Sequence, residues 1–196
     1  MRAGLPLRNS ARGKQNSVAP RPLRVPGPSL LSNSYDFRRY FCDMIRGMSA
    51  ALEQARRAAS LDEVPIGAVV MRGDEIVAAA HNETIARRNP TYHAEFLAIE
   101  RALEALETDR LTDCTLYVTI EPCALCAGAI VLAKVGKLVF GAYDEKAGMC
   151  GSLGDLVRHP RLNHRVEVTG GVEAETSADL IKTFFAAKRS TSQPHR

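Results

Sequence analysis

Apolar residues form two patterns along this chain, a helical spacing and short continuous runs, which predict where helices and strands lie. A spacing of three to four residues begins near Met48 and again near Glu173. It predicts a helix over 48–60 and a closing amphipathic helix over 173–188. Short apolar runs between them predict five strands, at residues 64–71, 76–80, 114–119, 137–141 and 166–169. The turn residues 72–75 predict that the first two strands form a hairpin.

Two further helices are predicted in the middle of the chain. Thr91 is the predicted N-cap of a helix over 93–106. The core face of that helix is predicted to contain Phe96, Leu97, Ile99, Leu103 and Leu106. Pro122 suits the first turn of the next helix, over 123–133. This second helix is apolar on nearly all sides, which predicts burial against a sheet or another subunit.

The order of these elements predicts the fold class. Strands that alternate with helices indicate an α/β protein, here a three-layer α/β/α sandwich around a central five-stranded mixed sheet. No internal repeat or domain boundary interrupts the chain after residue 48, and a hydrophobic content of 45% suffices for one sizeable core. We therefore expect a single domain over 48–189. The glycine-containing stretch 142–165 is expected to be mostly loop.

The two ends of the chain differ from this central pattern. Residues 1–47 are rich in Arg, Pro, Ser and Gly and lack sustained apolar periodicity, so we expect a disordered extension. An acid-poor, Arg- and Ser-rich leader is also typical of an organellar transit peptide. Translation that starts at Met44 or Met48 would remove most or all of this segment. Residues 190–196 are expected to form a short disordered tail.

The net charge of +4 indicates little about the domain, because the positive charge is concentrated at the N-terminus. Residues 1–47 carry nine of the 26 Lys and Arg and two of the 22 Asp and Glu, which leaves 17 basic and 20 acidic side chains. The predicted domain is therefore mildly acidic, and charge alone does not indicate nucleic acid binding. No apolar run approaches the roughly 18 residues of a membrane span, so we expect no association with a membrane.

Cysteine usage favours a reducing, cytosolic compartment. The chain has five cysteines and no secretory hydrophobic region, so a disulfide framework is not expected. Cys42, Cys114 and Cys150 show no metal-site spacing and are interpreted as small buried apolar residues or incidental thiols. Cys123 and Cys126, in contrast, have the spacing of metal ligands.

One histidine and two cysteines form the strongest chemical pattern. His93 opens a His-Ala-Glu stretch, and Cys123 and Cys126 belong to a Pro-Cys-x-x-Cys stretch. One imidazole and two thiolates suit zinc, and three protein ligands leave the fourth position open for water, as in catalytic sites. The two cysteines share one face of a helix, in its first turn, where the dipole favours the thiolate. Together the two stretches are the signature of the zinc nucleobase deaminases.

Glu95, two residues after His93, is the candidate proton carrier. Zinc lowers the pKa of a bound water towards ~7. A carboxylate beside that water would take its proton and pass it to the ring nitrogen and the leaving ammonia. Positions two apart point roughly 200° from each other on an ideal helix, so spacing alone does not bring Glu95 to the site. We expect both residues in the first turn, where a pocket can surround the helix end.

Two other interpretations of the metal ligands remain open. A structural zinc site needs a fourth protein ligand, and His81 is the candidate, although it lies in a strand-end loop without a motif. The Cys-x-x-Cys pair also has the spacing of a redox pair. That interpretation leaves the His-Ala-Glu stretch unexplained.

Longer sequence blocks extend the pattern beyond the metal ligands. They are VPIGAVV (64–70), HAE (93–95), LYVTIEPCALCAGAI (116–130), VFGAYDEKAG (139–148) and NHRVE (163–167). In these blocks, residues 48–188 closely resemble the bacterial tRNA adenosine deaminase family. The resemblance implies a cytidine-deaminase-like fold and a cytoplasmic homodimer. It also implies hydrolysis of the wobble adenosine to inosine in the anticodon stem-loop of transfer RNA.

The resemblance assigns roles to individual residues. It implies one Zn²⁺ per subunit, held by His93, Cys123 and Cys126, with Glu95 as the proton shuttle. Substrate binding would involve Asn82, which would hydrogen-bond the flipped base, together with Ala94 and Asp144. A polar and basic cluster, equally well interpreted as a solvated loop, is a candidate for phosphate contacts: Arg158, His159, Asn163, His164 and Arg165.

Two residues depart from the commonest family wording, Asn89 where Asp is frequent and Leu125 where Met is usual. They put only local loop packing in question.

The leading hypothesis is an RNA-editing hydrolase. A deaminase of a free base or nucleoside, such as guanine, cytosine or cytidine, shares both motifs, but blocks 139–148 and 163–167 favour RNA. A non-catalytic zinc-containing RNA-binding subunit is a further alternative, against which Glu95 argues.

Overall fold

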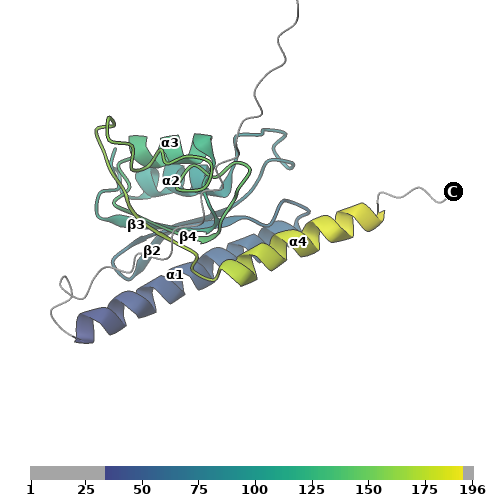
Figure 1. Ribbon diagram of the computed structural model, residues 1–196, viewed down its shortest axis with the longest axis horizontal. Coiled ribbons are helices and arrows are strands. Elements are labelled where there is room, and N and C mark those ends of the chain that lie inside the picture. Colours follow the sequence, from purple (N-terminus) through teal and green to yellow (C-terminus); the bar gives the residue numbers. More distant parts are fainter. Residues whose placement is uncertain (1–33, 192–196) are drawn as a thin grey trace, which may run out of the picture.

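The computed structural model describes residues 34–191, with side chains from residue 41 to residue 190. In this part of the chain, four helices surround one five-stranded sheet. The elements are α1 (Ser34–Ser60), β1 (Gly67–Arg72), β2 (Glu75–His81), α2 (Ala94–Ala105), β3 (Cys114–Ile120), α3 (Ala124–Leu132), β4 (Lys137–Ala142), β5 (Glu167–Gly170) and α4 (Ala174–Thr191). Helices α2 and α3 cover one face of the sheet, and α1 and α4 lie on the other (Figure 1). The predicted three-layer α/β/α fold is confirmed.

The sheet is mixed, with strand order β2-β1-β3-β4-β5. β1 pairs antiparallel with β2 and β3, whereas β3, β4 and β5 run parallel. The hairpin turns at Gly73, whose φ of 61° a glycine adopts without steric cost. Because β3 and β4 are parallel, their carboxyl ends meet at one edge, where Ile120 pairs with Ala142. The segments that follow these two residues therefore lie side by side.

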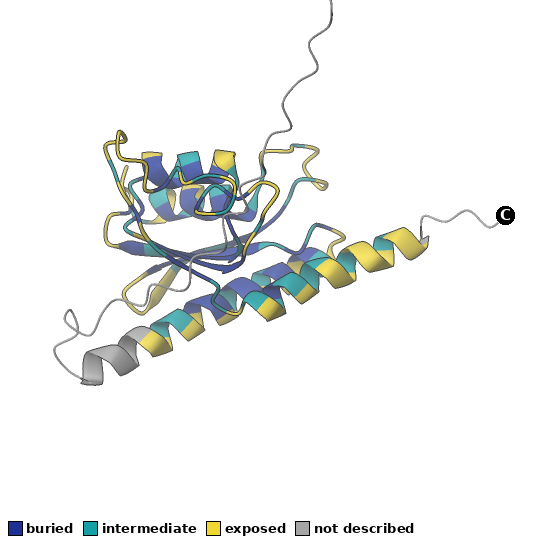
Figure 2. Ribbon diagram, viewed as in Figure 1, coloured by how far each residue is buried: buried dark blue, intermediate teal, exposed yellow. Residues whose placement is uncertain are grey.

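Two hydrophobic clusters fill the spaces on either side of the sheet. Leu116 and Val118 belong to the larger cluster, towards α2 and α3, whereas Tyr117 faces the smaller one beneath α1, because alternate strand residues point to opposite faces. α1 passes close to the sheet, since a Cβ added to Gly47 would lie 2.6 Å from the Tyr117 ring. Figure 2 shows the second half of α4 largely exposed. Of the helices within residues 34–191, none is both long and apolar enough to cross a membrane.

α1 begins earlier than the sequence pattern indicates. It starts at Ser34, inside the segment for which the sequence predicts disorder, and runs unbroken to Ser60. Met44 packs against the smaller cluster, and with Met48 and Ala51 it follows a helical spacing that keeps all three on one side. Of these three residues, Met48 and Ala51 belong to the predicted helix, whereas Met44 stands in the Arg-rich segment that obscures the helical spacing. Residues 1–33 and 192–196, which contain most of the predicted extension and tail, lie outside the described residues.

α2 differs from its predicted form at its start and on its core face. It begins at Ala94, with His93 instead of Thr91 at the N-cap. Thr91 donates its backbone N–H and its hydroxyl to the side chain of Asn89. Phe96 is half-buried and belongs to neither cluster. Small and aliphatic side chains form most of the buried face, and they let the helix lie close to the sheet: Ala94, Leu97, Ala98, Ile99 and Ala102.

Candidate active site

Three metal-type donors meet where β3 ends and two helices begin. His93 is the N-cap of α2, Cys123 is the N-cap of α3, and Cys126 lies in the first turn of α3. The Nδ1 atom of His93 is 3.5 Å from the Sγ atom of each cysteine. The three donor atoms lie within 4.8 Å of one another, and in the part of the chain that the structure describes no other group of His, Cys, Asp and Glu is arranged to hold a metal.

The two thiols act as a pair. The pKa of Cys123 is lowered, chiefly by hydrogen bonds with Cys126 and His93. The pKa of Cys126 is raised, first because it donates to Cys123 and second because it is buried. The pKa of His93 is raised as well, first by its hydrogen bond with Cys123. Metal ligation requires thiolates, so a cation that binds both sulfurs would displace the thiol proton of Cys126.

Glu95 lies beside these donors and interacts electrostatically with all three. Its side chain is 2% exposed, and its Oε2 atom has no hydrogen-bond partner among the described residues. Burial raises the pKa of its carboxyl group to about 7. On an ideal helix, His93 and Glu95 would point about 200° from each other. That geometry does not apply here, because His93 is an extended N-cap residue with φ −74° and ψ 152°. The imidazole and the carboxylate can therefore face the same space.

Asn82 approaches the site from the end of β2. Its buried side chain accepts the backbone N–H of Ala94 with Oδ1 at 2.9 Å. This bond caps α2, whose own N-cap residue makes no side-chain cap. It also orients the amide, because the oxygen is occupied and the NH₂ group is left to donate elsewhere. His81 directs its Nδ1 to the Asn82 carbonyl oxygen at 2.8 Å and is not part of the donor group.

Glu121, which follows β3 directly, holds the loop after β4 in place. It is 1% exposed. Its Oε1 accepts the backbone N–H groups of Cys150 at 2.9 Å and Ser152 at 3.0 Å. Its Oε2 accepts the backbone N–H of Asp144 at 3.1 Å and the Ser152 hydroxyl. Asp144 itself is half-buried, and its side chain accepts two backbone N–H groups of the next turn.

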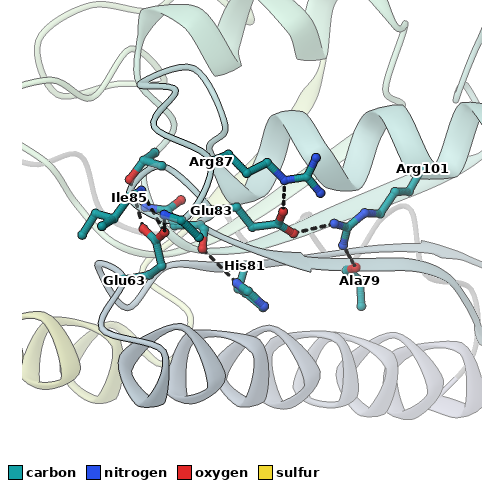
Figure 3. A network of polar contacts seen from close by, with 10 residues as sticks. Glu63, Ala79, His81, Glu83, Ile85, Arg87 and Arg101 are labelled. Atoms are coloured by element: carbon teal, nitrogen blue, oxygen red, sulfur yellow. Dashed lines mark hydrogen bonds and ion pairs between the residues drawn. The ribbon is translucent and has the colours of Figure 1, made fainter.

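Glu63 has the same role on the other side of the site, for the loop between β2 and α2. It is 1% exposed. Its Oε1 accepts the backbone N–H groups of Ile85 at 2.8 Å and Ala86 at 2.7 Å, and its Oε2 accepts the Thr84 hydroxyl at 3.1 Å (Figure 3). Sequence reasoning missed both Glu63 and Glu121. In the sequence, each of these residues is a single acid next to an apolar strand. That pattern does not reveal which backbone N–H groups the acid will bind.

The predicted RNA contacts do not form one free basic patch. Arg158 pairs with Asp155 at 2.8 Å and donates to the carbonyl oxygen of Cys150 at 3.0 Å. His164 directs its Nε2 to the carbonyl oxygen of Val135 at 2.7 Å, just past the C-terminal end of α3 and thus at the opposite end of that helix from Cys123. The remaining three members are exposed: His159, Asn163 and Arg165.

Known proteins with a similar sequence are deaminases. The family model of the MafB19-like deaminases matches residues 42–189. The tRNA-specific adenosine deaminase of Bacillus subtilis (strain 168) is 44% identical over 149 residues, which cover 76% of this chain and 92% of that protein. The tRNA-specific adenosine deaminase of Aquifex aeolicus (strain VF5) is 40% identical over 143 residues, or 73% of this chain and 94% of that protein.

Solved structures of deaminases share the fold. A structure from studies of A-to-I editing by tRNA:A34 deaminases at the wobble position of transfer RNA superposes with a TM-score of 0.66 and 38% identity. It covers 69% of this chain and 99% of its own. Guanine deaminase from Nitrosomonas europaea superposes with a TM-score of 0.63 and 25% identity, over 71% of this chain and 83% of its own. Sequence identity is therefore higher to the transfer RNA deaminase than to the free-base deaminase.

Proposed function

The chain belongs to the family of tRNA-specific adenosine deaminases, and we propose that it converts adenosine to inosine at the wobble position of the transfer RNA anticodon. In this reaction water attacks C6 of the adenine ring, the exocyclic amine leaves as ammonia, and a carbonyl oxygen replaces it. The observation that carries the proposal is a His, Cys, Cys donor group beside a buried carboxylate, in a chain 44% identical to such an enzyme.

We propose that His93, Cys123 and Cys126 hold one Zn²⁺ per subunit. The donor set of one imidazole and two sulfur atoms suits zinc. The buried, unpartnered Oε2 of Glu95 supports a site with room for a hydrogen-bonding group in front of that oxygen. When bound, zinc supplies a hydroxide at neutral pH by lowering the pKa of water.

Glu95 is the proposed proton carrier of the reaction. Because burial raises its pKa to about 7, the carboxylate can both accept and release a proton near neutral pH. It takes a proton from the attacking water and delivers it to the ring nitrogen. It then takes the second proton from the hydroxyl group added to C6 and passes it to the departing amine, so that a carbonyl group and ammonia result. Glu95 already lies beside the donors, so it can carry these protons without a movement of α2.

Asn82 and Ala94 are proposed to position the base. The Ala94 N–H holds the Asn82 oxygen, so the Asn82 NH₂ group donates to an acceptor on the flipped adenine. Asp144 is proposed to lie at the RNA-facing mouth, on the loop that Glu121 braces. Among the predicted phosphate contacts we favour the exposed His159, because Asn163 and Arg165 flank His164 at the far end of α3 and Arg165 also donates to the carbonyl oxygen of Pro160. Arg158 and His164 already hold backbone oxygens.

We further propose that the protein is a cytoplasmic homodimer. Leu125 and Leu132 on α3 are 40% and 80% exposed, and two exposed leucines on one helix suit a protein interface. Free thiols without a disulfide among the described residues suit a reducing compartment.

The proposal is tested by measuring inosine formation on an anticodon stem-loop that carries a wobble adenosine. The Glu95→Ala variant, with its zinc content measured, is the control. Inosine from the wild type and none from the zinc-loaded variant supports both the substrate and the role of Glu95. A stem-loop with guanosine at the wobble position should release no ammonia.

The likeness to a guanine deaminase makes deamination of a free base the second candidate. Ammonia release from guanine or cytidine, without inosine in the stem-loop, would favour it. Zinc-loaded protein that binds the stem-loop but acts on none of these substrates would instead indicate a non-catalytic RNA-binding subunit.

A further inference from the structure

The loop between β2 and α2, residues 83–90, is a compact turn at the edge of the site. It begins directly after Asn82 and ends shortly before His93. Backbone hydrogen bonds run from Arg87 to Glu83 at 3.1 Å, from Arg88 to Ile85 at 3.1 Å and from Asn89 to Thr84 at 3.0 Å. These bonds form a single helical turn closed by a Schellman-type end. We call this segment the β2–α2 loop.

Side chains hold the β2–α2 loop from below and from the side (Figure 3). Glu63 lies below the loop and accepts the backbone N–H groups of Ile85 and Ala86. Glu83 lies between two arginines, 2.5 Å from Arg87 and 2.6 Å from Arg101, and Arg101 also donates to the carbonyl oxygen of Ala79 at 2.9 Å. The loop is therefore built before any ligand arrives, so binding to it costs little ordering.

Arg88 is the residue of this loop that the fold does not use. It is exposed, and among the residues that the structure describes it has no ion-pair partner. Arg87, in contrast, is paired with Glu83 and lies 5.1 Å from the centre of the Tyr92 ring. Arg88 has a φ of 49°, in the left-handed region that side chains disfavour. Glycine would suit this backbone conformation better, so an arginine here carries a cost in stability.

We propose that the β2–α2 loop is a second RNA-binding surface, in which Arg88 contacts a phosphate of the anticodon loop. This inference rests on the proposed function. A base that enters the site must leave its stack, and the phosphates on either side of it then need fixed partners. An unpaired guanidinium on a rigid turn next to Asn82 meets that need. Ile85, 57% exposed on the same turn, offers an apolar contact for a neighbouring base.

Lys134 provides a matched control for Arg88. It also has a positive φ, 55°, directly after the C-cap of α3 and thus at the opposite end of that helix from Cys123. Arg88→Gly and Lys134→Gly each remove one cation and each relieve a left-handed side chain. Both variants should keep or raise the thermal midpoint. Any difference in RNA binding between them reports on position and not on stability or net charge.

The experiment measures the affinity of each zinc-loaded protein for a fluorescent anticodon stem-loop at several salt concentrations. Arg88→Gly is expected to weaken binding roughly fivefold to tenfold and to reduce the slope of log K against log salt by about one. Lys134→Gly should bind like the wild type. Arg88→Lys should keep most of the salt slope, since it keeps the charge.

Equal affinity and equal salt slopes for Arg88→Gly and Lys134→Gly would overturn the inference. That result is distinguishable from failure of the proposed function, in which the wild type itself forms no inosine. A wild type that is active, with a stable Arg88→Gly variant that binds RNA less well, supports the second surface.

Discussion

The centre of the site and its two flanking loops use a buried carboxylate in opposite ways. In the loops, Glu63 accepts three hydrogen bonds and Glu121 accepts four. At the centre, Glu95 is just as buried, yet its Oε2 has no partner. A carboxylate whose oxygens are occupied by the fold supports the fold. One whose oxygen is unused is available to a substrate.

The two flanking loops also differ from each other. The loop after β4 uses its own cation, since Arg158 pairs with Asp155 and binds a backbone oxygen. The β2–α2 loop leaves Arg88 unpaired among the described residues. We infer that each loop braces the site and contacts RNA, and that the β2–α2 loop does so with a cation that its own turn does not use.

The strongest test of the comparison is Glu95→Gln. Because the amide cannot carry the proton, kcat on the stem-loop should fall about 10³-fold, or roughly 4 kcal/mol of transition-state stabilisation. Zinc content should be unchanged, as metal analysis can verify. A variant that keeps its zinc and more than a tenth of wild-type activity would remove Glu95 from the chemistry.

Glu121→Ala should cause the largest loss of folding stability. It leaves buried backbone donors, including that of Cys150, without acceptors, which should cost about 3–4 kcal/mol and lower the thermal midpoint by about 10 °C. Glu145→Ala, an exposed acid in the same loop, is the control and should change little. Equal midpoints for the two variants would show that the bracing by Glu121 is unimportant.

The pH dependence of stability should separate Glu95 from the other buried acids. Its folded-state pKa of about 7 lies above the unfolded value of 4.5, so its contribution to stability is present below pH 4.5 and is lost as the pH rises towards 7. In metal-free protein, Glu95→Gln should match the wild type at low pH and exceed its stability by up to about 3 kcal/mol above pH 7. Denaturant unfolding at several pH values measures this, and a constant difference would contradict it.

Glu63→Ala should have the smallest of these effects. The backbone donors that it would release belong to Ile85 and Ala86, which are exposed, so water can replace the carboxylate. We expect a loss of about 1–2 kcal/mol in unfolding free energy. KM for the stem-loop should rise several-fold with little change in kcat. Glu104→Ala, on the exposed side of α2, is the control, and a fall in kcat at constant KM would argue against a role in RNA binding.

The sequence by itself determined the elements and the identity of the donor group. Short apolar runs for strands and a period near four for helices predict burial locally, so the five strands and the middle and C-terminal helices lie close to their predicted positions. His93, Cys123 and Cys126 were identifiable because donors at helix starts after a strand are brought to one sheet edge by the topology. The start of α1 was missed, because the few apolar residues of 34–47 stand in an Arg-rich segment and are a weak signal.

Only the tertiary structure decided which groups these elements bring into contact. Glu63 meets backbone groups 22 and 23 residues away, and Glu121 meets one 31 residues away. The incomplete burial of Phe96 and the unpaired charge of Arg88 likewise depend on neighbours from other elements. Local spacing specifies which face a residue occupies, but a hydrogen bond depends on loop closure between distant segments. For that reason the metal donors could be predicted from the sequence, whereas the carboxylates that hold the flanking loops could not.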